Sequence, residues 1–254
     1  MLSKHFQLLL HVDSTRRLSL YKDLLTGTLP SPEALLPLEQ RMVEMLTFRL
    51  LQRDARQEGC AWDTGLKRLQ QNASACSEFQ ELCGVLFERV KLHTNEEPAI
   101  DGCPIFLHRQ YMRDEVLVGL GLPQLVGARH TQTGRFWLDA INTEIFFVTL
   151  DKSEKAFSPS TRYEDFAVSP TRFHWQSQST TGENSPTGQR YVHQSDNKAR
   201  FLLFVRPKPG APFLFLGPLR YVSHSGSRPM SIYWDLEHPM PAWFFEICAS
   251  LRAA

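Results

Sequence analysis

Ala199-Arg-Phe-Leu-Leu-Phe-Val-Arg206, Phe213-Leu-Phe-Leu216 and Arg220-Tyr-Val-Ser-His224 follow one another in the chain and decide the fold of its C-terminal half. These runs are short, rich in β-branched and aromatic residues, and separated by turn-forming residues, which is the pattern of strands. The same pattern recurs from Arg129 onward and indicates about eight short strands, typical of a closed or nearly closed barrel or of a sandwich. The other predicted strands are Arg135–Leu138, Glu144–Leu150, Arg172–Ser177, Gly188–His193 and Met230–Leu236.

The residues before Arg129 follow a helical period instead. Asp13 or Ser14 can cap a helix that ends at Gly27. Apolar residues recur at helical spacing through the segments that follow, and Thr94–Cys103 resembles a linker. The sequence therefore predicts an α+β protein, with a helical section over residues 1–125 and an antiparallel β-barrel-like domain over residues 126–254. Further helices are predicted at Met42–Leu51, Asp63–Gln71, Ser74–Leu92 and Arg113–Leu120.

The composition is typical of a folded protein but does not indicate what the protein binds. The 254 residues are 42% hydrophobic and include 17 Phe and 5 Trp. The formal net charge is +1, with 14 Lys and Arg against 16 Asp and Glu up to residue 128, and 14 against 11 thereafter. The C-terminal half is therefore mildly basic, which permits phosphate contacts without indicating them strongly.

The five cysteines form no Cys-x-x-Cys pair, and we expect them to be reduced in a cytoplasmic protein. Apolar runs stay shorter than a membrane span, so no membrane partner is expected. Histidine and cysteine spacings match no zinc motif, and no phosphate-binding glycine loop is present. We therefore expect no metal and no cofactor.

The most informative string is Phe173-His-Trp-Gln-Ser-Gln-Ser179. Strand alternation puts His174, Gln176 and Gln178 on one face, where such side chains can read base edges. Trp175, with Tyr163 and Phe166, is a candidate stacking surface for a base. In the simpler interpretation the aromatic residues are core and the polar row is a solvated face.

A second string, Tyr221-Val-Ser-His-Ser-Gly-Ser-Arg-Pro229, places hydroxyls, an imidazole and a guanidinium around a glycine turn. Backbone N–H groups and an arginine can hold a phosphate in such a turn, although an ordinary hairpin turn fits equally well. Arg190 is a weaker phosphate candidate. Between the two strings, Ser177–Gly188 is a long polar connection of the kind that is often functional or mobile.

Catalytic motifs are incomplete. Asp196-Asn-Lys198 has the spacing of part of a restriction-nuclease site, but no upstream Pro-Asp accompanies it and it lies in a predicted hairpin turn. Ser, His and Asp occur without a Gly-x-Ser-x-Gly elbow. We therefore assign no catalytic residue, and an unrecognised nuclease or hydrolase stays an alternative.

Several strings are familiar as a set: Phe147–Phe166, Phe173–Ser179, Ser185-Pro-Thr-Gly-Gln-Arg-Tyr191 and Tyr221–Met230. They resemble an uncharacterised bacterial domain at the C-terminus of superfamily II DEAD-type helicase proteins, often with an N-terminal phospholipase-D-like nuclease. The helical opening also resembles that family's lead-in, although the motor and nuclease motifs are absent. The resemblance implies a DNA-processing setting, restriction or phage defence, with a helicase or nuclease partner in cis or in trans.

By analogy, restriction systems of this kind use small β-barrel readers of B3, SRA or PUA-like type, an argument at the level of fold alone. The leading hypothesis is thus a DNA-binding recognition module, for duplex or single-stranded DNA, that senses sequence or base modification. A protein docking module for a helicase is the other alternative. The candidate nucleic-acid-binding residues are Arg162, Tyr163, Arg172, His174, Trp175, Gln176, Gln178, Arg190, Tyr221, His224 and Arg228.

Overall fold

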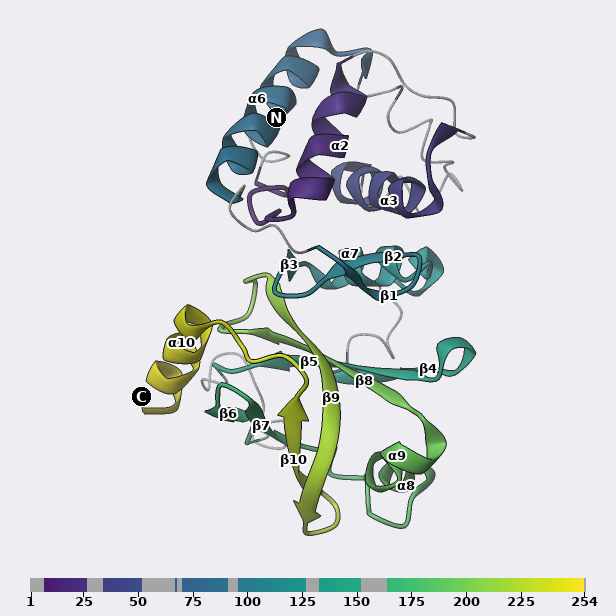
Figure 1. Ribbon diagram of the computed structural model, residues 1–254, viewed down its shortest axis with the longest axis vertical. Coiled ribbons are helices and arrows are strands. Elements are labelled where there is room, and N and C mark those ends of the chain that lie inside the picture. The colour runs from purple at the N-terminus through teal and green to yellow at the C-terminus, as the bar shows by residue number, and fades with distance from the viewer. Residues whose placement is uncertain are drawn as a thin grey trace. The chain divides into compact units, whose positions relative to one another are not determined.

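The computed structural model in Figure 1 describes residues 7–26, 34–51, 67, 70–90, 96–126, 133–151 and 164–253. The chain forms two compact units, Met1–Ala128 and Arg129–Ala254. In the part of the chain that the structure describes, every helix is too short or too polar to cross a membrane.

The first unit is mostly helical. Its apolar core is built from buried residues that recur at helical spacing, such as Leu18, Tyr21, Val43 and Phe79. The elements in chain order are α2 (Thr15–Leu25), α3 (Pro37–Leu51), α6 (Ala73–Val90), β1 (Pro98–Ile100), β2 (Cys103–Phe106), β3 (Gln110–Tyr111), α7 (Arg113–Gly119) and the short 3-10 helix η2 (Pro123–Leu125).

Helix α2 begins where the sequence predicted, with Ser14 as the N-cap. The Ser14 hydroxyl accepts a hydrogen bond from the Arg17 N–H at 3.1 Å. The carboxylate of Glu96 accepts from the N–H groups of Thr15 and Arg16, at 2.8 and 2.9 Å. A distant acidic residue thus satisfies donors that the helix itself leaves free.

Two further predictions in this unit concern the linker Thr94–Cys103 and the helix Asp63–Gln71. Part of the predicted linker Thr94–Cys103 forms an antiparallel hairpin, in which Ile100 pairs with Cys103 and Gly102 turns the chain at a positive φ of 72°. The predicted helix Asp63–Gln71 lies mostly outside the described residues.

The second unit is built on one mixed sheet. Its strand order is β4-β5-β8-β9-β10-β7-β6, in which β5 and β8 are parallel and the other neighbouring pairs are antiparallel. The elements are β4 (Arg135–Leu138), the 3-10 helix η4 (Asp139–Ile141), β5 (Thr143–Thr149), β6 (Phe166–Ser169), β7 (Arg172–Gln176), α8 (Pro186–Val192), α9 (Gln194–Asn197), β8 (Arg200–Arg206), β9 (Phe213–Ser225), β10 (Ser231–Leu236) and α10 (Ala242–Ala253).

The predicted antiparallel barrel-like sheet is wrong, because the sheet contains a parallel pair and is open, with a strand order that ends at β4 and β6. The predicted strand Gly188–His193 is also wrong, since residues up to Val192 belong to helix α8 and His193 is its C-cap. Ser185 caps that helix by accepting from the Gly188 N–H at 3.0 Å, and Pro186 occupies its first turn. The segment around Asp196, predicted as a hairpin turn, is the short helix α9.

Strand β9 connects the two halves of this sheet, as its long curved ribbon in Figure 1 shows. Leu214–Pro218 pairs with β8 and Leu219–Ser225 pairs with β10. At the change of partner, Gly217 has a φ of 93° and the register with β8 shifts. A glycine bulge at this position lets the strand bend.

The bend brings the two halves of the sheet face to face around an aromatic core. Phe146 of β5 stacks on Trp175 of β7 with ring centroids 4.3 Å apart, although these strands are not neighbours in the sheet. Phe201 of β8 lies 4.9 Å from Trp234 of β10 in the same way. Helix α10, which the sequence analysis did not predict, adds buried apolar residues to this core.

Candidate functional site

Two of the strings singled out in the sequence meet in the second unit. The Ser177 N–H donates to the Met230 carbonyl at 2.9 Å, and the Ser177 hydroxyl accepts from the Met230 N–H at 2.8 Å. The Arg228 N–H donates to the Thr181 carbonyl at 3.3 Å. The polar connection 177–188 is therefore bound to residues 221–230, and we call these two segments together the loop–hairpin junction.

Two glycines allow this junction to pack closely. A Cβ on Gly188 would lie 2.1 Å from the carbonyl oxygen of Gly182. A Cβ on Gly182 would lie 3.0 Å from the Ser227 hydroxyl. The Glu183 N–H donates to that same hydroxyl at 3.2 Å. The connection is thus packed tightly on its own backbone at Gly188 and on hairpin side chains at Gly182, and neither place tolerates much added volume.

A chain of polar side chains crosses the junction. The Tyr221 hydroxyl lies 2.6 Å from Nδ1 of His224, and Nε2 of His224 lies 3.7 Å from a carboxylate oxygen of Glu183. Burial, together with the charge of Glu183, raises the pKa of the Tyr221 phenol. The side chain of Arg228 is exposed, and its Nε would lie 3.1 Å from a Cβ on Gly182, the residue before Glu183.

A polar face lies on the side of β9, β10 and β7 that points away from the aromatic core. Burial alternates along β10, so Ile232 and Trp234 face the core while Tyr233 between them faces outward. Residues paired across strands share a face, and the register therefore defines its members. The polar face consists of Arg220, Ser223 and Ser225 of β9, Ser231, Tyr233 and Asp235 of β10, and Arg172, His174 and Gln176 of β7.

The middle row of the polar face is a series of ring contacts. The ring of His174 lies 5.1 Å from the ring of Tyr233 and stacks on Phe166 of β6 at 4.6 Å. The guanidinium carbon of Arg252 lies 3.9 Å from the Phe166 ring centroid. Nδ1 of His174 donates to the Glu164 carbonyl at 2.6 Å. His174 is consequently held in place and only 5% exposed.

The charged residues of the polar face lie in the row nearest the end of β10, which consists of Arg172, Asp235 and Arg220. Arg172 donates two hydrogen bonds to Asp235, at 2.8 and 3.2 Å. These bonds lower the pKa of Asp235, and the neighbouring Arg220 contributes through its charge. Arg220 is exposed. Two arginines therefore flank one carboxylate, which leaves a net positive charge at this end of the polar face.

Several predicted site residues are not accessible to a ligand in the way that the sequence analysis expected. Trp175 is buried in the aromatic core, so the stacking role predicted for it does not fit its placement. His174, predicted on an open row, is covered by the rings beside it. Gln176 accepts from the Glu164 N–H at 3.2 Å, and Gln178 is partly exposed at the junction.

Arg190 is bound elsewhere in the unit. It donates to the fully buried Glu144 at 2.9 Å, where Arg135 also donates at 2.7 Å, and it packs on the Trp137 ring at 3.8 Å. The Tyr191 hydroxyl lies 3.5 Å from the same carboxylate, and burial and the charge of Glu144 raise its pKa well above the usual value. Arg162 and Tyr163 lie outside the described residues.

The sequence analysis missed Tyr233, Asp235, Glu183 and Arg252. A signal existed for the first two, because Ser231-Ile-Tyr-Trp-Asp-Leu236 alternates polar and apolar residues and places Tyr233 and Asp235 together. Glu183 and Arg252 become relevant only through the fold. No local pattern connects them with residues 40 to 90 positions away.

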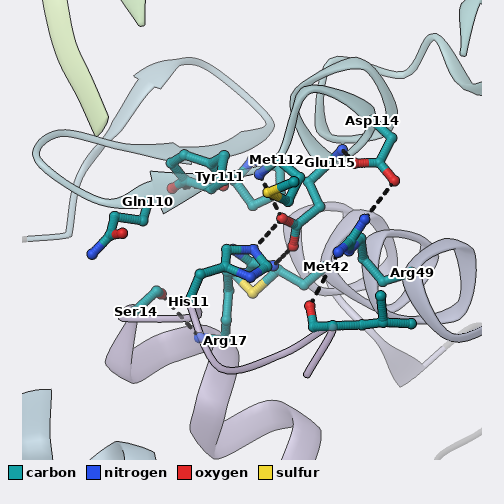
Figure 2. A network of polar contacts seen from close by, with 12 residues as sticks. His11, Ser14, Arg17, Met42, Arg49, Gln110, Tyr111, Met112, Asp114 and Glu115 are labelled. Atoms are coloured by element: carbon teal, nitrogen blue, oxygen red, sulfur yellow. Dashed lines mark hydrogen bonds and ion pairs between the residues drawn. The ribbon is translucent and has the colours of Figure 1, made fainter. Parts of the chain in front are cut away.

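The first unit contains a different polar network, drawn in Figure 2, with the carboxylate of Glu115 at its centre. Glu115 accepts from Arg17, contacts Nε2 of His11, and accepts from the Met112 N–H at 2.8 Å. Burial raises the pKa of this carboxyl, but His11 and Arg17 outweigh it and hold the pKa far below its usual range. Since the Glu115 and Arg17 side chains are fully buried, this network is a structural ion pair that no substrate reaches.

Among the described ranges, no three His, Cys, Asp or Glu residues come together as a metal site. A family model described as "Domain of unknown function (DUF3427)" matches residues 105–247. A search of curated proteins finds no match.

Proposed function

Because the chain belongs to the DUF3427 family, whose description states no activity, we propose from the geometry of its second unit that it binds nucleic acid along the polar face. The observation that carries this proposal is the register of β7, β10 and β9. It gathers arginines, hydroxyls, an amide and a partly exposed tyrosine on one side of a sheet. The other side of the same strands is apolar core.

Positive charge supports the proposal at one end of this face. Arg220 and Arg172 flank Asp235, and Arg252 lies over Phe166 in the adjoining row. A chain with a formal charge of only +1 binds a polyanion by concentrating its cations locally. We assign phosphate contacts to Arg220 and Arg252. Arg172 serves mainly to hold Asp235.

The uncharged members of the face suit the bases. Tyr233 is partly exposed and its ring is supported by His174, which suits it to stacking against a base. Gln176 lies opposite Ser231 in the next row, and amide and hydroxyl groups both hydrogen-bond to base edges. An open sheet face with these side chains fits a single strand better than a duplex. The bases of a single strand are splayed and accessible, whereas those of a duplex are paired.

The wider setting rests on the resemblance of the sequence to domains that follow DEAD-type helicases. On that basis we propose DNA as the nucleic acid, and a helicase or nuclease as the partner. Sensing of a particular sequence or modified base belongs to the same proposal. Catalysis is not part of it.

A docking role is the second candidate, and Trp243 favours it. This residue at the start of α10 is 50% exposed, although tryptophan is seldom left so open. Replacement of Trp243 by Ala separates the two functions. If the binding proposal is correct, the variant retains the affinity of the wild type for DNA. If the docking proposal is correct, the variant loses its binding to a partner protein, and neither the variant nor the wild type binds DNA.

The experiment that tests the proposal measures binding of the chain to single-stranded, duplex and base-modified oligonucleotides at two salt concentrations. We expect single-stranded DNA to bind most tightly, with an affinity that falls as salt increases. Absence of salt-dependent binding to any of the three would contradict the proposal.

A further inference from the structure

The chain of side chains at the loop–hairpin junction has the order of a nucleophilic site: a hydroxyl, an imidazole and a carboxylate. Tyr221 contacts Nδ1 of His224 at 2.6 Å, and Glu183 lies 3.7 Å from the opposite ring nitrogen. An activated nucleophile requires a base within hydrogen-bonding distance and a third group that orients the base. The base lies within hydrogen-bonding distance of the hydroxyl, and the carboxylate lies at ion-pair distance from the base. None of the three takes part in the contacts of the polar face.

The carboxylate selects the useful tautomer of the imidazole. The negative charge of Glu183 favours a proton on Nε2 of His224, the nitrogen nearer to it. Nδ1 then carries a lone pair and accepts the hydrogen bond that the Tyr221 hydroxyl donates. In this state His224 is poised to remove the phenolic proton.

The junction holds the backbone of Glu183 and of Tyr221 in place. The Glu183 N–H is bound to the Ser227 hydroxyl, and the Glu183 carbonyl accepts from the Gln189 side chain at 3.1 Å. The Tyr221 N–H donates to Gln194 at 2.6 Å. Burial raises the pKa of the Tyr221 phenol, so the resting hydroxyl stays protonated and needs a base at the moment of attack.

The exposed position of the site suits a phosphodiester. Glu183 and Arg228 are both exposed, and His224 is partly exposed. Gly182 lies against the Arg228 side chain, since a Cβ on that glycine would be 3.1 Å from Nε of Arg228. The Arg228 side chain therefore lies beside the residue that precedes Glu183, where a guanidinium can neutralise charge on a phosphoryl group.

From this geometry we propose that Tyr221 is a nucleophile for phosphodiesters, with His224 as its general base, Glu183 as the positioning residue and Arg228 as the phosphoryl contact. The phenolic oxygen forms a bond to phosphorus while the bond from phosphorus to the leaving oxygen breaks. His224 takes the phenolic proton and passes it to the leaving oxygen. The products are a tyrosine phosphodiester and a free alcohol, and no oxidant, metal or co-reactant is consumed.

The choice of nucleic acid as the natural phosphodiester rests on the proposed function, but the nucleophile itself is testable without it. The full chain is incubated with bis(p-nitrophenyl) phosphate, a small activated diester that does not require the polar face. Attack releases one equivalent of p-nitrophenol, which is followed by absorbance. Peptide mass spectrometry locates the phosphoryl group, which we expect on Tyr221.

Matched variants separate chemistry from folding. His224→Gln should reduce the rate of labelling at least tenfold, whereas His193→Gln, which alters an exposed histidine 3.3 Å from Asp196, should leave it unchanged. Tyr221→Phe should abolish labelling at this residue, and Glu183→Gln should slow it while the chain keeps its melting temperature. Circular dichroism on each variant excludes misfolding as the cause.

Labelling that is absent from Tyr221 in the folded wild-type chain would overturn the proposal, as would equal rates for His224→Gln and wild type. Labelling of Tyr221 without DNA binding would contradict the proposed function but support Tyr221 as a nucleophile. DNA binding without labelling would support the proposed function and contradict the nucleophile.

Discussion

Gly188 lies against the backbone of Gly182 so closely that a Cβ on Gly188 would be 2.1 Å from the Gly182 carbonyl oxygen. Because the obstacle is backbone, no side-chain rotation relieves the clash. Gly188→Ala should therefore destabilise the second unit by about 1–3 kcal/mol, the usual cost of overpacking. Gly134→Ala is the matched control, since its Cβ would lie 3.5 Å from the Phe147 carbonyl oxygen in ordinary contact. Urea unfolding followed by tryptophan fluorescence measures both, and similar midpoints for the two variants would contradict this account.

Glu144 is the shared acceptor of two arginines, and its removal should destabilise the second unit. The carboxylate is fully buried, while the Arg135 and Arg190 side chains are 20% and 21% exposed. Water can therefore solvate part of the arginine charge once the acceptor is lost, and we expect Glu144→Ala to cost about 1–3 kcal/mol rather than the larger penalty of a wholly buried pair. Arg200→Ala, at an exposed position, should change the unfolding free energy by less than about 0.5 kcal/mol.

The Glu115 network should make the first unit sensitive to acid. The pKa of this carboxyl is lower in the folded state than in the unfolded chain, because His11 and Arg17 favour its charged form. The ionised Glu115 carboxylate therefore stabilises the first unit at a pH above the unfolded-state pKa of about 4.3. This stabilisation is lost as the pH falls from that value toward the folded-state pKa. Hydrogen exchange of the α2 and α7 amides between pH 3 and pH 6 should show this loss in wild type. Glu115→Gln should start less protected and change less with pH.

Asp13 should have the opposite effect. Burial raises the pKa of its carboxyl, so the folded state disfavours its charge and this residue opposes folding as the pH rises above the unfolded value. Asp13→Asn keeps an oxygen that accepts from the Gln110 N–H, a bond of 2.8 Å. The variant should be more stable than wild type at pH 7 and nearly equal to it at pH 3. A variant that is less stable at pH 7 would show that the charge is compensated.

Arg220 should contribute to DNA binding through a phosphate contact. Arg220→Ala should weaken binding to all sequences alike and reduce the slope of log affinity against log salt by about 1. Arg200→Ala provides the control, as an exposed arginine of the same unit that is not on the polar face. Fluorescence anisotropy with a labelled oligonucleotide at several salt concentrations gives both slopes, and equal effects of the two substitutions would remove the polar face from the interface.

The sequence predicted those elements whose evidence is local. The cap at Ser14, the apolar spacing through α3 and α6, the aromatic residues of β7 and the alternation along β10 each lie within a few residues of chain. The helix α8 also had a local signal in Ser185-Pro186, which the strand prediction overlooked.

The remainder depended on pairings between distant residues. The parallel pairing of β5 with β8, which rules out the predicted antiparallel barrel, joins strands that are some 50 residues apart. The carboxylates that bind Arg172 and Arg190 are 63 and 46 positions away in the chain. Single-sequence patterns place arginines on strands and helices but contain no information about such partners, so both residues were predicted as free phosphate contacts.

The position of β9 has a consequence for the order in which the second unit assembles. Strands β8, β9 and β10 follow one another directly and pair in that order, so each closure joins the ends of a short loop at a small entropic cost. We expect this meander to form first, with the bend at Gly217 already in place. Strand β5 reaches its parallel partner β8 only after some 50 intervening residues are positioned, which makes its docking a late event. Since β5 contributes both Phe146 and Glu144, the aromatic core and the buried ion pair are completed together, and partial unfolding would lose both at once.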